Sequence, residues 1–346
     1  MNNGLIHRYK IIGIICICCS IVFGSFLIWS PVYMEYYDKN VNYAAYMAGD
    51  TGSYPIYIDG IRIIEYKLLH QVGNLANEPE IILVGSSNTR LGLVHNYSFK
   101  DGYSLKNFGM SSSNPYSDKL MLNYIRLEGN RNLSSSDVVV FNLFFGYFME
   151  KNYLDDFTKQ SLDMFGTYTI DSSANITGKM STLQRFYLDY ICRYHAFLET
   201  FHIAEKVKDL FQNNNSKINL TSSNNSIDCA KYVYEWEERT KNTKYPSNIT
   251  DEFESLVMDI NTQCKVVVVN LYIPSFLRST SKEKEYEHWL SESFLPMLHE
   301  NNITYLDLSR SIPDCEFEDS THLTRLGREN FTRQFDLAFR NLSIFE

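Results

Sequence analysis

Short apolar runs recur along the chain after residue 80, and amphipathic stretches separate them. The run at 81–85 ends at Gly85, and the run at 266–272 is stopped by Pro274. Such short continuous runs are typical of strands buried in a parallel sheet. We therefore expect strands at 81–85, 138–143, 266–272 and 303–308, with a weaker one at 103–108.

Apolar residues in the intervening stretches recur at the spacing of one helix face. Helices are expected over 60–75, 115–128, 284–299 and 323–340. Because strands alternate with helices, the pattern predicts an α/β fold. In such a fold, helices cover both faces of a parallel sheet and form three layers.

The pattern changes between about residues 150 and 262. An aromatic, helix-like stretch at 183–210 is followed by Asn- and Ser-rich sequence at 213–226. We interpret 150–262 as a mainly helical insertion or cap on the α/β domain. Insertions of this kind often shape access to a substrate site, although this one contains no motif that points to a particular chemistry.

The N-terminal pattern is that of a membrane segment. Residues 11–29 contain no charged side chain and would span roughly 28 Å as a helix, close to the thickness of the hydrocarbon core. Arg8 and Lys10 precede the segment and Trp29 ends it, as in an anchor with a cytoplasmic N-terminus. The alternative is a cleaved signal peptide, but the run is longer than a usual signal and no A-x-A-like cleavage site follows it.

An uncleaved anchor divides the chain into regions of different environment. We expect a cytoplasmic tail at 1–10, a transmembrane anchor at 11–29, a juxtamembrane connector at 30–79 and an extracytoplasmic α/β domain at 80–346.

Charge and cysteine content narrow the functional classes. The formal net charge is -9 and no basic run stands out. We expect no nucleic-acid partner, because phosphate binding needs clustered Lys and Arg. Beyond the apolar N-terminal run, Cys192, Cys229, Cys264 and Cys315 permit two disulfides but are equally compatible with free thiols. No C-x-x-C or His/Cys cluster outside that run suggests a metal, and we expect no cofactor.

Candidate chemistry lies at two distant points of the chain. Gly85-Ser86-Ser87 follows the first strand, where a sharp turn into a helix would expose a serine hydroxyl and aim backbone N–H groups at developing negative charge. Asp319 and His322 follow the last strand and precede the C-terminal helix. Together they supply a nucleophile, a general base and a carboxylate that orients the base, which acyl transfer from an ester requires.

These motifs, in this order, resemble those of the SGNH/GDSL hydrolase superfamily, in the membrane-anchored bacterial subset whose first motif is Gly-Ser-Ser. The chain is also similar to extracytoplasmic proteins that move acetyl or D-alanyl groups onto cell-surface polymers. The resemblance covers about 80–145 and 264–340 and implies a flavodoxin-like sheet. It also implies that Ser87 is the nucleophile, His322 the base and Asp319 its orienting partner.

The resemblance further implies an oxyanion hole. The Asn-Phe-Gly sequence at 107–109 resembles the second block of the family, in which the backbone N–H of Gly109 binds the oxyanion. The third block departs from the family pattern, because 141–148 lacks Gly-x-Asn-Asp. Asn142 lies a few residues early, within the expected strand, and Asn114 is the alternative donor. Loss of one donor typically lowers the rate ~100- to 1,000-fold.

We expect a membrane-anchored serine esterase or O-acyltransferase that acts on acyl esters, acetyl above all, of a cell-surface glycan or lipid-linked saccharide. The domain would face the periplasmic side of a bacterial inner membrane, and transfer would need a membrane partner that exports the acyl group. A plain esterase or lipase is a second hypothesis. A third is a non-catalytic scaffold or binding protein in envelope polysaccharide assembly, because a fold does not fix a function.

Overall fold

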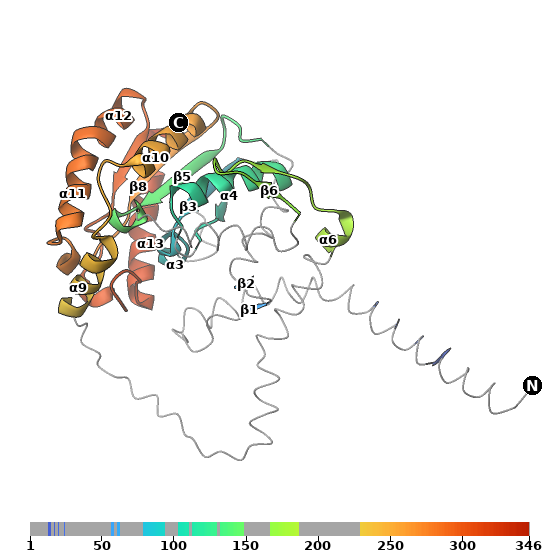
Figure 1. Ribbon diagram of the computed structural model, residues 1–346, viewed down its shortest axis with the longest axis horizontal. Coiled ribbons are helices and arrows are strands. Elements are labelled where there is room, and N and C mark those ends of the chain that lie inside the picture. The colour runs from blue at the N-terminus through green and yellow to red at the C-terminus, as the bar shows by residue number, and fades with distance from the viewer. Residues whose placement is uncertain are drawn as a thin grey trace, which may run out of the picture. The chain divides into compact units, whose positions relative to one another are not determined.

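The computed structural model describes residues 79–93, 103–110, 113–129, 132–148, 167–186 and 229–345, together with single residues and pairs between 13 and 62. The chain divides into two compact units. They consist of Met1–Ile63 with Ser181–Ser216, and of Ile64–Met180 with Lys217–Glu346. Figure 1 draws the described helices and strands, coloured along the chain.

The described part of the first unit is small. It contains an antiparallel pair of short strands, β1 (Tyr57–Ile58) and β2 (Ile61–Arg62), and the helix α6 (Thr182–Phe186). The helix predicted over 60–75 is wrong at its start, because β2 pairs with β1; its later residues lie outside the described ranges. Most of the predicted anchor at 11–29 also lies outside them. Within the described residues, no helix has the length and apolar character needed to cross a membrane.

A parallel sheet of five strands forms the second unit, in the order β4-β3-β5-β8-β9. The strands are β3 (Glu80–Gly85), β4 (Ser104–Asn107), β5 (Val138–Leu143), β8 (Lys265–Asn270) and β9 (Thr304–Asp307). Val138 pairs with Ile81 on one side and with Lys265 on the other, so β5 is central. Both β3 and β5 are buried along their whole length, as continuous apolar runs predict. The predicted parallel α/β fold is confirmed.

The helices of this unit agree with the predicted pattern in most places. They are α3 (Ser87–Gly92), α4 (Pro115–Glu128), α9 (Cys229–Thr240), α10 (Asn248–Asn261), α11 (Ser281–Trp289), α12 (Leu295–Glu300) and α13 (Arg325–Arg340). The helix predicted over 115–128 is confirmed at both ends. The helix predicted over 284–299 is divided, because a π-helical turn, η5 (Leu290–Phe294), separates α11 from α12.

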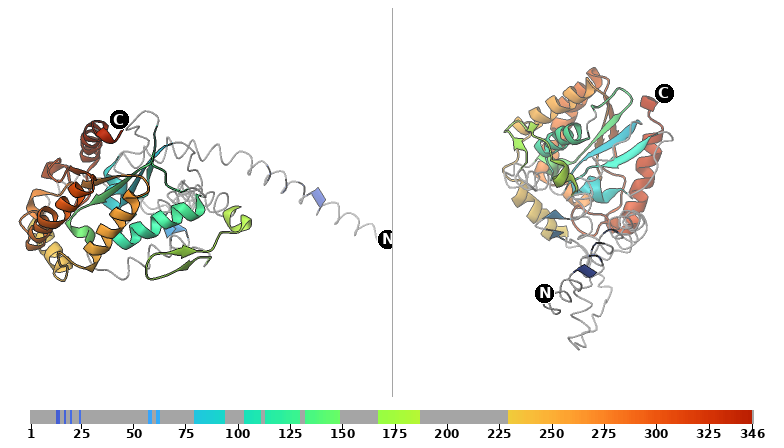
Figure 2. Two further views of the ribbon diagram at one scale, coloured as in Figure 1. Left: turned by 90° about the horizontal axis from the view of Figure 1, so that it is seen from above. Right: turned by 90° about the vertical axis from the view of Figure 1, so that its right-hand side faces the viewer.

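Helices cover both faces of the sheet (Figure 2). On one face α4 packs against α10, and the ring of Phe253 in α10 meets the ring of Phe141 in β5 at 5.6 Å. On the other face α13 contributes Phe331, Phe335 and Phe339 to a core that also contains alternate residues of β3, β5 and β8. Because side chains alternate across a strand, each central strand contributes to both cores.

Aromatic side chains pack around the segment that follows β5. This segment is a 3-10 turn, η2 (Phe145–Phe148), and the ring of Phe148 lies 5.0 Å from that of Trp289 and 5.5 Å from that of Phe253. The turn is fully buried. The end of β5 is therefore fixed by packing between η2, α10 and α11.

A small hairpin, β6 (Thr169–Ile170) and β7 (Ile176–Thr177), is tied to α4. The hydroxyl of Tyr116 donates to the carbonyl of Asp171 at 3.0 Å, and Nδ2 of Asn123 donates to the carbonyl of Ala174 at 2.8 Å. This hairpin and α10 both fall within the region predicted to be an insertion.

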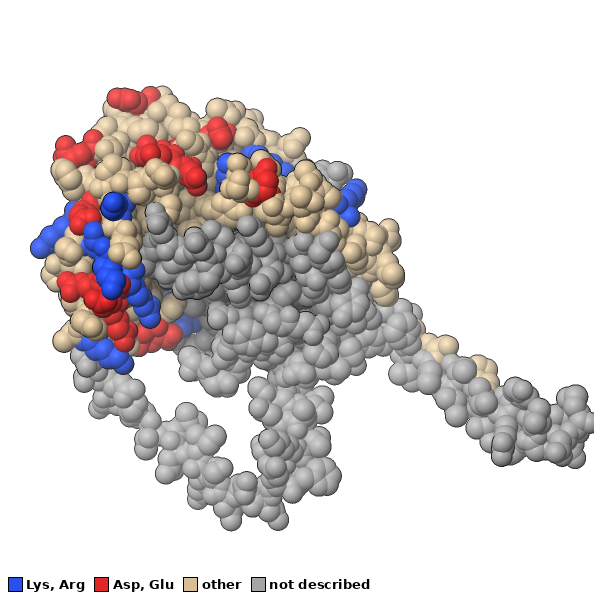
Figure 3. Space-filling model, viewed as in Figure 1, with Lys and Arg blue, Asp and Glu red and all other residues tan. Residues whose placement is uncertain are grey.

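On the face of the second unit shown in Figure 3, acidic and basic side chains are interspersed.

Candidate active site

The strand β3 ends in a turn that requires glycine. Gly85 has φ +142°, a conformation that other residues rarely adopt. A Cβ atom there would lie 2.4 Å from Oγ1 of Thr89 and 2.8 Å from the carbonyl oxygen of Asn142. Ser86 then caps α3, its Oγ accepting a backbone N–H from the first turn at 3.3 Å. Ser87 is thereby the first residue of α3, half-buried at the carboxyl edge of the sheet.

Ser87, His322 and Asp319 form a continuous hydrogen-bonded chain. Oγ of Ser87 lies 3.1 Å from Nε2 of His322, and Nδ1 of His322 lies 2.7 Å from Oδ2 of Asp319. An ionised carboxylate can only accept, so Nδ1 carries the ring proton and Nε2 accepts the Ser87 hydroxyl. The fold thus brings together the predicted nucleophile, base and orienting acid from segments 235 residues apart.

Asp319 is held by the backbone of its own loop. Its Oδ1 accepts the N–H groups of Thr321 at 2.7 Å and of His322 at 2.8 Å, while Oδ2 faces the imidazole. Burial alone would raise the pKa of this carboxyl. The hydrogen bond and charge of His322 and the two backbone N–H groups outweigh burial and hold the pKa below its ordinary value. Asp319 is therefore ionised in neutral solution.

The loop that carries His322 is anchored to α13. The N–H of Glu318 donates to the carbonyl of His322 at 2.9 Å, and Phe317 and Leu323 form an antiparallel bridge. Arg328 of α13 is buried; its Nε donates to the carbonyl of Leu323 at 2.9 Å, and its guanidinium lies 3.5 Å from the Glu318 carboxylate. The C-terminal helix thus sets the position of the imidazole.

Gly109, the predicted backbone donor of the oxyanion hole, is already hydrogen bonded. Its N–H donates to the side-chain oxygen of Asn107 at 3.0 Å, and Nδ2 of Asn107 donates to the carbonyl of Thr89 in α3 at 3.1 Å. The Gly109 N–H can bind an oxyanion only by sharing this bond or after Asn107 turns away. Its role in catalysis stays a prediction.

Asn114, one of the predicted side-chain donors, caps a helix. Its Oδ1 accepts the N–H of Ser117 at 2.9 Å, and Pro115 follows as the first residue of α4. An Asn-Pro pair is a typical helix start. The cap accounts for Asn114 without a part in oxyanion binding.

Asn142, the other predicted side-chain donor, lies inside β5 and pairs in register with Gly85. It is 1% exposed, and neither its Oδ1 nor its Nδ2 has a hydrogen-bond partner among the described residues. The same holds for Oγ1 of Thr89. Buried polar atoms without partners are rare in folded proteins, so the side chains of Asn142 and Thr89 next to the nucleophile turn are unusual. A donor role for Asn142 stays a prediction.

A buried polar cluster also lies beside the nucleophile turn, and no sequence motif signals it. Asp118, in the first turn of α4, accepts hydrogen bonds from Oγ of Ser113 at 2.6 Å and from the hydroxyl of Tyr147 at 2.5 Å. In the sequence, Asp118 looks like any acidic residue at a helix N-terminus. Its meeting with Tyr147 depends on how η2 packs and cannot be predicted from local pattern.

Possible metal ligands and cysteine thiols are the other reactive groups in the described part of the chain. No group of three or more His, Cys, Asp or Glu side chains there is arranged to hold a metal ion. Cys229, Cys264 and Cys315 are free thiols, so no disulfide joins these three; Cys192 lies outside the described residues. Burial raises the pKa of Cys264 to about 12, as expected for a core thiol without nucleophilic character.

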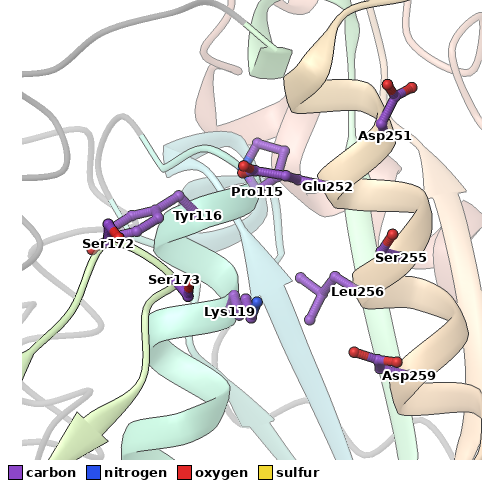
Figure 4. A pocket seen from close by; sticks show the side chains of 10 residues that line it. All are labelled: Pro115, Tyr116, Lys119, Ser172, Ser173, Asp251, Glu252, Ser255, Leu256 and Asp259. Carbon is purple, nitrogen blue, oxygen red and sulfur yellow. The ribbon is translucent and has the colours of Figure 1, made fainter.

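A cavity of about 260 Å³ lies between α4, α10 and the turn of the β6–β7 hairpin (Figure 4). Lys119 of α4 and Asp259 of α10 stand on its opposite walls. None of Ser87, His322 and Asp319 lines it. This cavity is therefore separate from the hydrogen-bonded residues Ser87, His322 and Asp319.

Comparisons with known proteins give a limited result. No protein-family model matches the sequence, and no curated protein is significantly similar to it. Among solved structures, a member of the lipolytic G-D-S-L family from Veillonella parvula has 9% identity and a TM-score of 0.36, covering 76% of this chain and 99% of its own. The acetylxylan esterase Axe2 from Geobacillus stearothermophilus has 10% identity and a TM-score of 0.36, covering 78% and 96%. These TM-scores are too low to assign a family, so the functional argument depends on the geometry of the site.

Proposed function

We propose that this protein is a serine ester hydrolase or O-acyltransferase of the SGNH type, with Ser87 as nucleophile. The single observation that carries the proposal is the chain of contacts from Ser87 through His322 to Asp319, at 3.1 and 2.7 Å. A serine within hydrogen-bond distance of a histidine that is oriented by a carboxylate is the arrangement that activates a hydroxyl for attack on an acyl carbonyl.

The first half of the reaction forms an acyl-enzyme. Oγ of Ser87 attacks the carbonyl carbon of the ester while its proton passes to Nε2 of His322, and Asp319 stabilises the resulting imidazolium. When the tetrahedral intermediate collapses, the imidazolium returns the proton to the leaving alcohol oxygen. The acyl group is then bound to Ser87 as an ester, and His322 is neutral again.

The second half of the reaction decides between hydrolysis and transfer. His322 takes a proton from the acceptor, whose oxygen attacks the acyl-Ser87 carbonyl. When this second tetrahedral intermediate collapses, the bond between the acyl carbon and Oγ of Ser87 breaks, and His322 returns the proton to Oγ. Water as the acceptor gives a free acid, whereas a sugar hydroxyl gives a new ester. We propose an acetyl ester on a cell-surface glycan or lipid-linked saccharide as the substrate, since the apolar segment at 11–29 would hold the domain near the envelope. As an acetyltransferase, the protein would depend on a membrane partner that exports the acyl group.

A specific observation favours a second candidate function, that of a non-catalytic scaffold or binding protein with this fold. The Gly109 N–H is already donated to Asn107, Asn114 is a helix cap, and Asn142 lies inside a strand. An oxyanion hole built from these residues would therefore need rearrangement before it could bind. Both candidates predict a stable fold, but only the enzyme predicts a reactive Ser87.

Turnover of p-nitrophenyl acetate by the full chain in detergent tests the proposal. The account expects hydrolysis by the wild type and a loss of at least about 10³-fold in Ser87→Ala, since the nucleophile is removed. The adjacent Ser86→Ala is the matched control: it removes a helix cap but keeps the nucleophile, and should retain activity within about tenfold. A folded wild type that neither turns over esters nor reacts with a fluorophosphonate would support the scaffold.

A further inference from the structure

Tyr272 lies between the helix that begins at Ser87 and the segment that carries His322. It follows the last residue of β8 by two positions, and its side chain is fully buried. The hydroxyl donates to the carbonyl of Asn88 in α3 at 3.2 Å. This hydrogen bond therefore reaches the residue that comes directly after the nucleophile.

The contact with α3 extends along the tyrosine ring. Gly92, the last residue of α3, lies so close that a Cβ atom there would be 2.8 Å from the hydroxyl oxygen and 3.0 Å from Cε1 of Tyr272. A helix of six residues is too short to be stable alone, so contacts from outside fix where α3 lies. Tyr272 supplies such contacts near both ends of the helix, at Asn88 and at Gly92.

The same ring packs against the segment that carries His322. Its centroid lies 5.7 Å from that of Phe317 and 4.6 Å from that of Phe331 in α13, both in edge-to-face geometry. Phe317 forms the antiparallel bridge with Leu323, the residue directly after His322. Tyr272 therefore contacts both the helix of the nucleophile and the structure that holds the base.

The backbone on either side of Tyr272 is held by neighbouring segments. The N–H of Leu271 donates to the carbonyl of Leu143, at the end of β5, at 2.8 Å. The N–H of Ile273 donates to the carbonyl of Ser309, which follows β9, at 2.9 Å. Because protein interiors are close-packed, a buried ring on a fixed backbone leaves its hydroxyl little room to move.

A second side chain holds α3 from the far side of the sheet. Nδ2 of Asn107, at the end of β4, donates to the carbonyl of Thr89 at 3.1 Å. Strands β4 and β8 lie on opposite sides of β3 and β5, so α3 is held from two directions. Asn107 also accepts the N–H of Gly109, a predicted oxyanion donor, so its substitution would have two effects on the site. Tyr272 is therefore the better residue with which to test the position of α3.

We propose that Tyr272 is a positioning residue that sets the distance between Oγ of Ser87 and Nε2 of His322. The inference rests on the proposed function of Ser87 and deepens it. Tyr272 acts through the Asn88 carbonyl and through Phe317, not on the reacting atoms. An error in this distance affects the chemical step more than substrate binding, because the proton of Ser87 can pass to His322 only within a hydrogen-bonded pair.

The test is steady-state turnover of p-nitrophenyl acetate by the full chain in detergent, in wild type, Tyr272→Phe and Tyr286→Phe. Tyr272→Phe removes only the hydroxyl and should lower kcat about tenfold, with KM unchanged within about twofold. Tyr286→Phe is the matched control, because Tyr286 is also fully buried and its hydroxyl donates to Oδ1 of Asn270 at 2.9 Å. Both variants should lose a similar amount of thermal stability, but only Tyr272→Phe should lose rate.

Gly92→Ala tests the same contact from the side of α3. Its Cβ atom should displace the Tyr272 hydroxyl and lower kcat. In the Tyr272→Phe background the same change should cost much less, since the nearest atom has been removed, so the two losses should not multiply.

Two results would overturn the positioning role while Ser87→Ala still abolishes turnover. One is an equal kcat in Tyr272→Phe and Tyr286→Phe, and the other is a double variant in which the losses of Tyr272→Phe and Gly92→Ala multiply. Absence of turnover in a folded wild type would instead overturn the proposed function, and this inference with it.

Discussion

At the scale of single residues, the chemistry depends on which nitrogen of His322 is free. Asp319 accepts from Nδ1, so Nε2 keeps its lone pair for the Ser87 hydroxyl. The pKa of Asp319 lies below its ordinary value, although burial opposes this, because His322 and two backbone N–H groups favour the ionised form. The contribution of this depressed pKa to folding is present above the pKa of the unfolded chain and is lost as the pH falls through the folded-state pKa.

Replacement of Asp319 tests this orientation. Asp319→Asn should keep the fold and lower kcat/KM about 10³- to 10⁴-fold, because an amide no longer fixes the proton on Nδ1. Steady-state kinetics with an acetyl ester measure the loss. The control is Glu318→Gln in the same loop: its amide oxygen can still accept from the buried guanidinium of Arg328, so the rate should change by less than about fivefold. Equal losses in both variants would indicate a disturbed loop, contrary to the account.

At the scale of elements, the boundaries that the sequence predicts best are set by local chemistry. The run at 138–143 and the helix at 115–128 coincide with β5 and α4. The apolar run begins directly after the polar pair Ser136-Asp137, and the helix begins at an Asn-Pro pair. The division of the segment at 284–299 is not predicted, because the π-helical turn keeps the apolar spacing of a continuous helix.

The cap of α4 can be separated from an oxyanion role by substitution at Asn114. Asn114→Ala should lower the free energy of unfolding by about 1 kcal/mol, since the N–H of Ser117 loses its acceptor. Asn114→Asp should restore most of that stability, because aspartate is an equally good cap and its charge suits a helix N-terminus. Chemical denaturation measures both. A loss of ester turnover in Asn114→Ala of 100-fold or more, as an oxyanion donor predicts, would contradict the account.

At the scale of the whole molecule, parallel topology explains why two distant motifs meet. The carboxyl ends of parallel strands lie at one edge of the sheet, so Ser87 after β3 and His322 after β9 could be placed together from the sequence. The contacts between loops could not be predicted from the sequence. Asp118 meets Tyr147, and Arg328 meets Glu318, only because of how η2 and α13 pack, and local pattern does not encode that packing.

The packing of α13 should govern both stability and the position of His322. Phe335 is fully buried between Phe331 and Phe339, and Phe335→Ala should cost about 3–5 kcal/mol in the free energy of unfolding. Leu337 on the same helix is 68% exposed, and Leu337→Ala should change stability by less than about 0.5 kcal/mol. Denaturant unfolding of both variants checks the difference; similar values would contradict the observed face of α13.

The most direct test of the central claim is the site of covalent labelling by a fluorophosphonate, mapped by tandem mass spectrometry on the full chain. This reagent reacts with an activated serine whether water or a sugar is the natural acceptor, so the result does not depend on the acyl donor or on a partner. The account predicts a label on Ser87, undiminished in Ser86→Ala and greatly slowed in His322→Ala. Labelling of another residue, or none on a folded wild type, would contradict it.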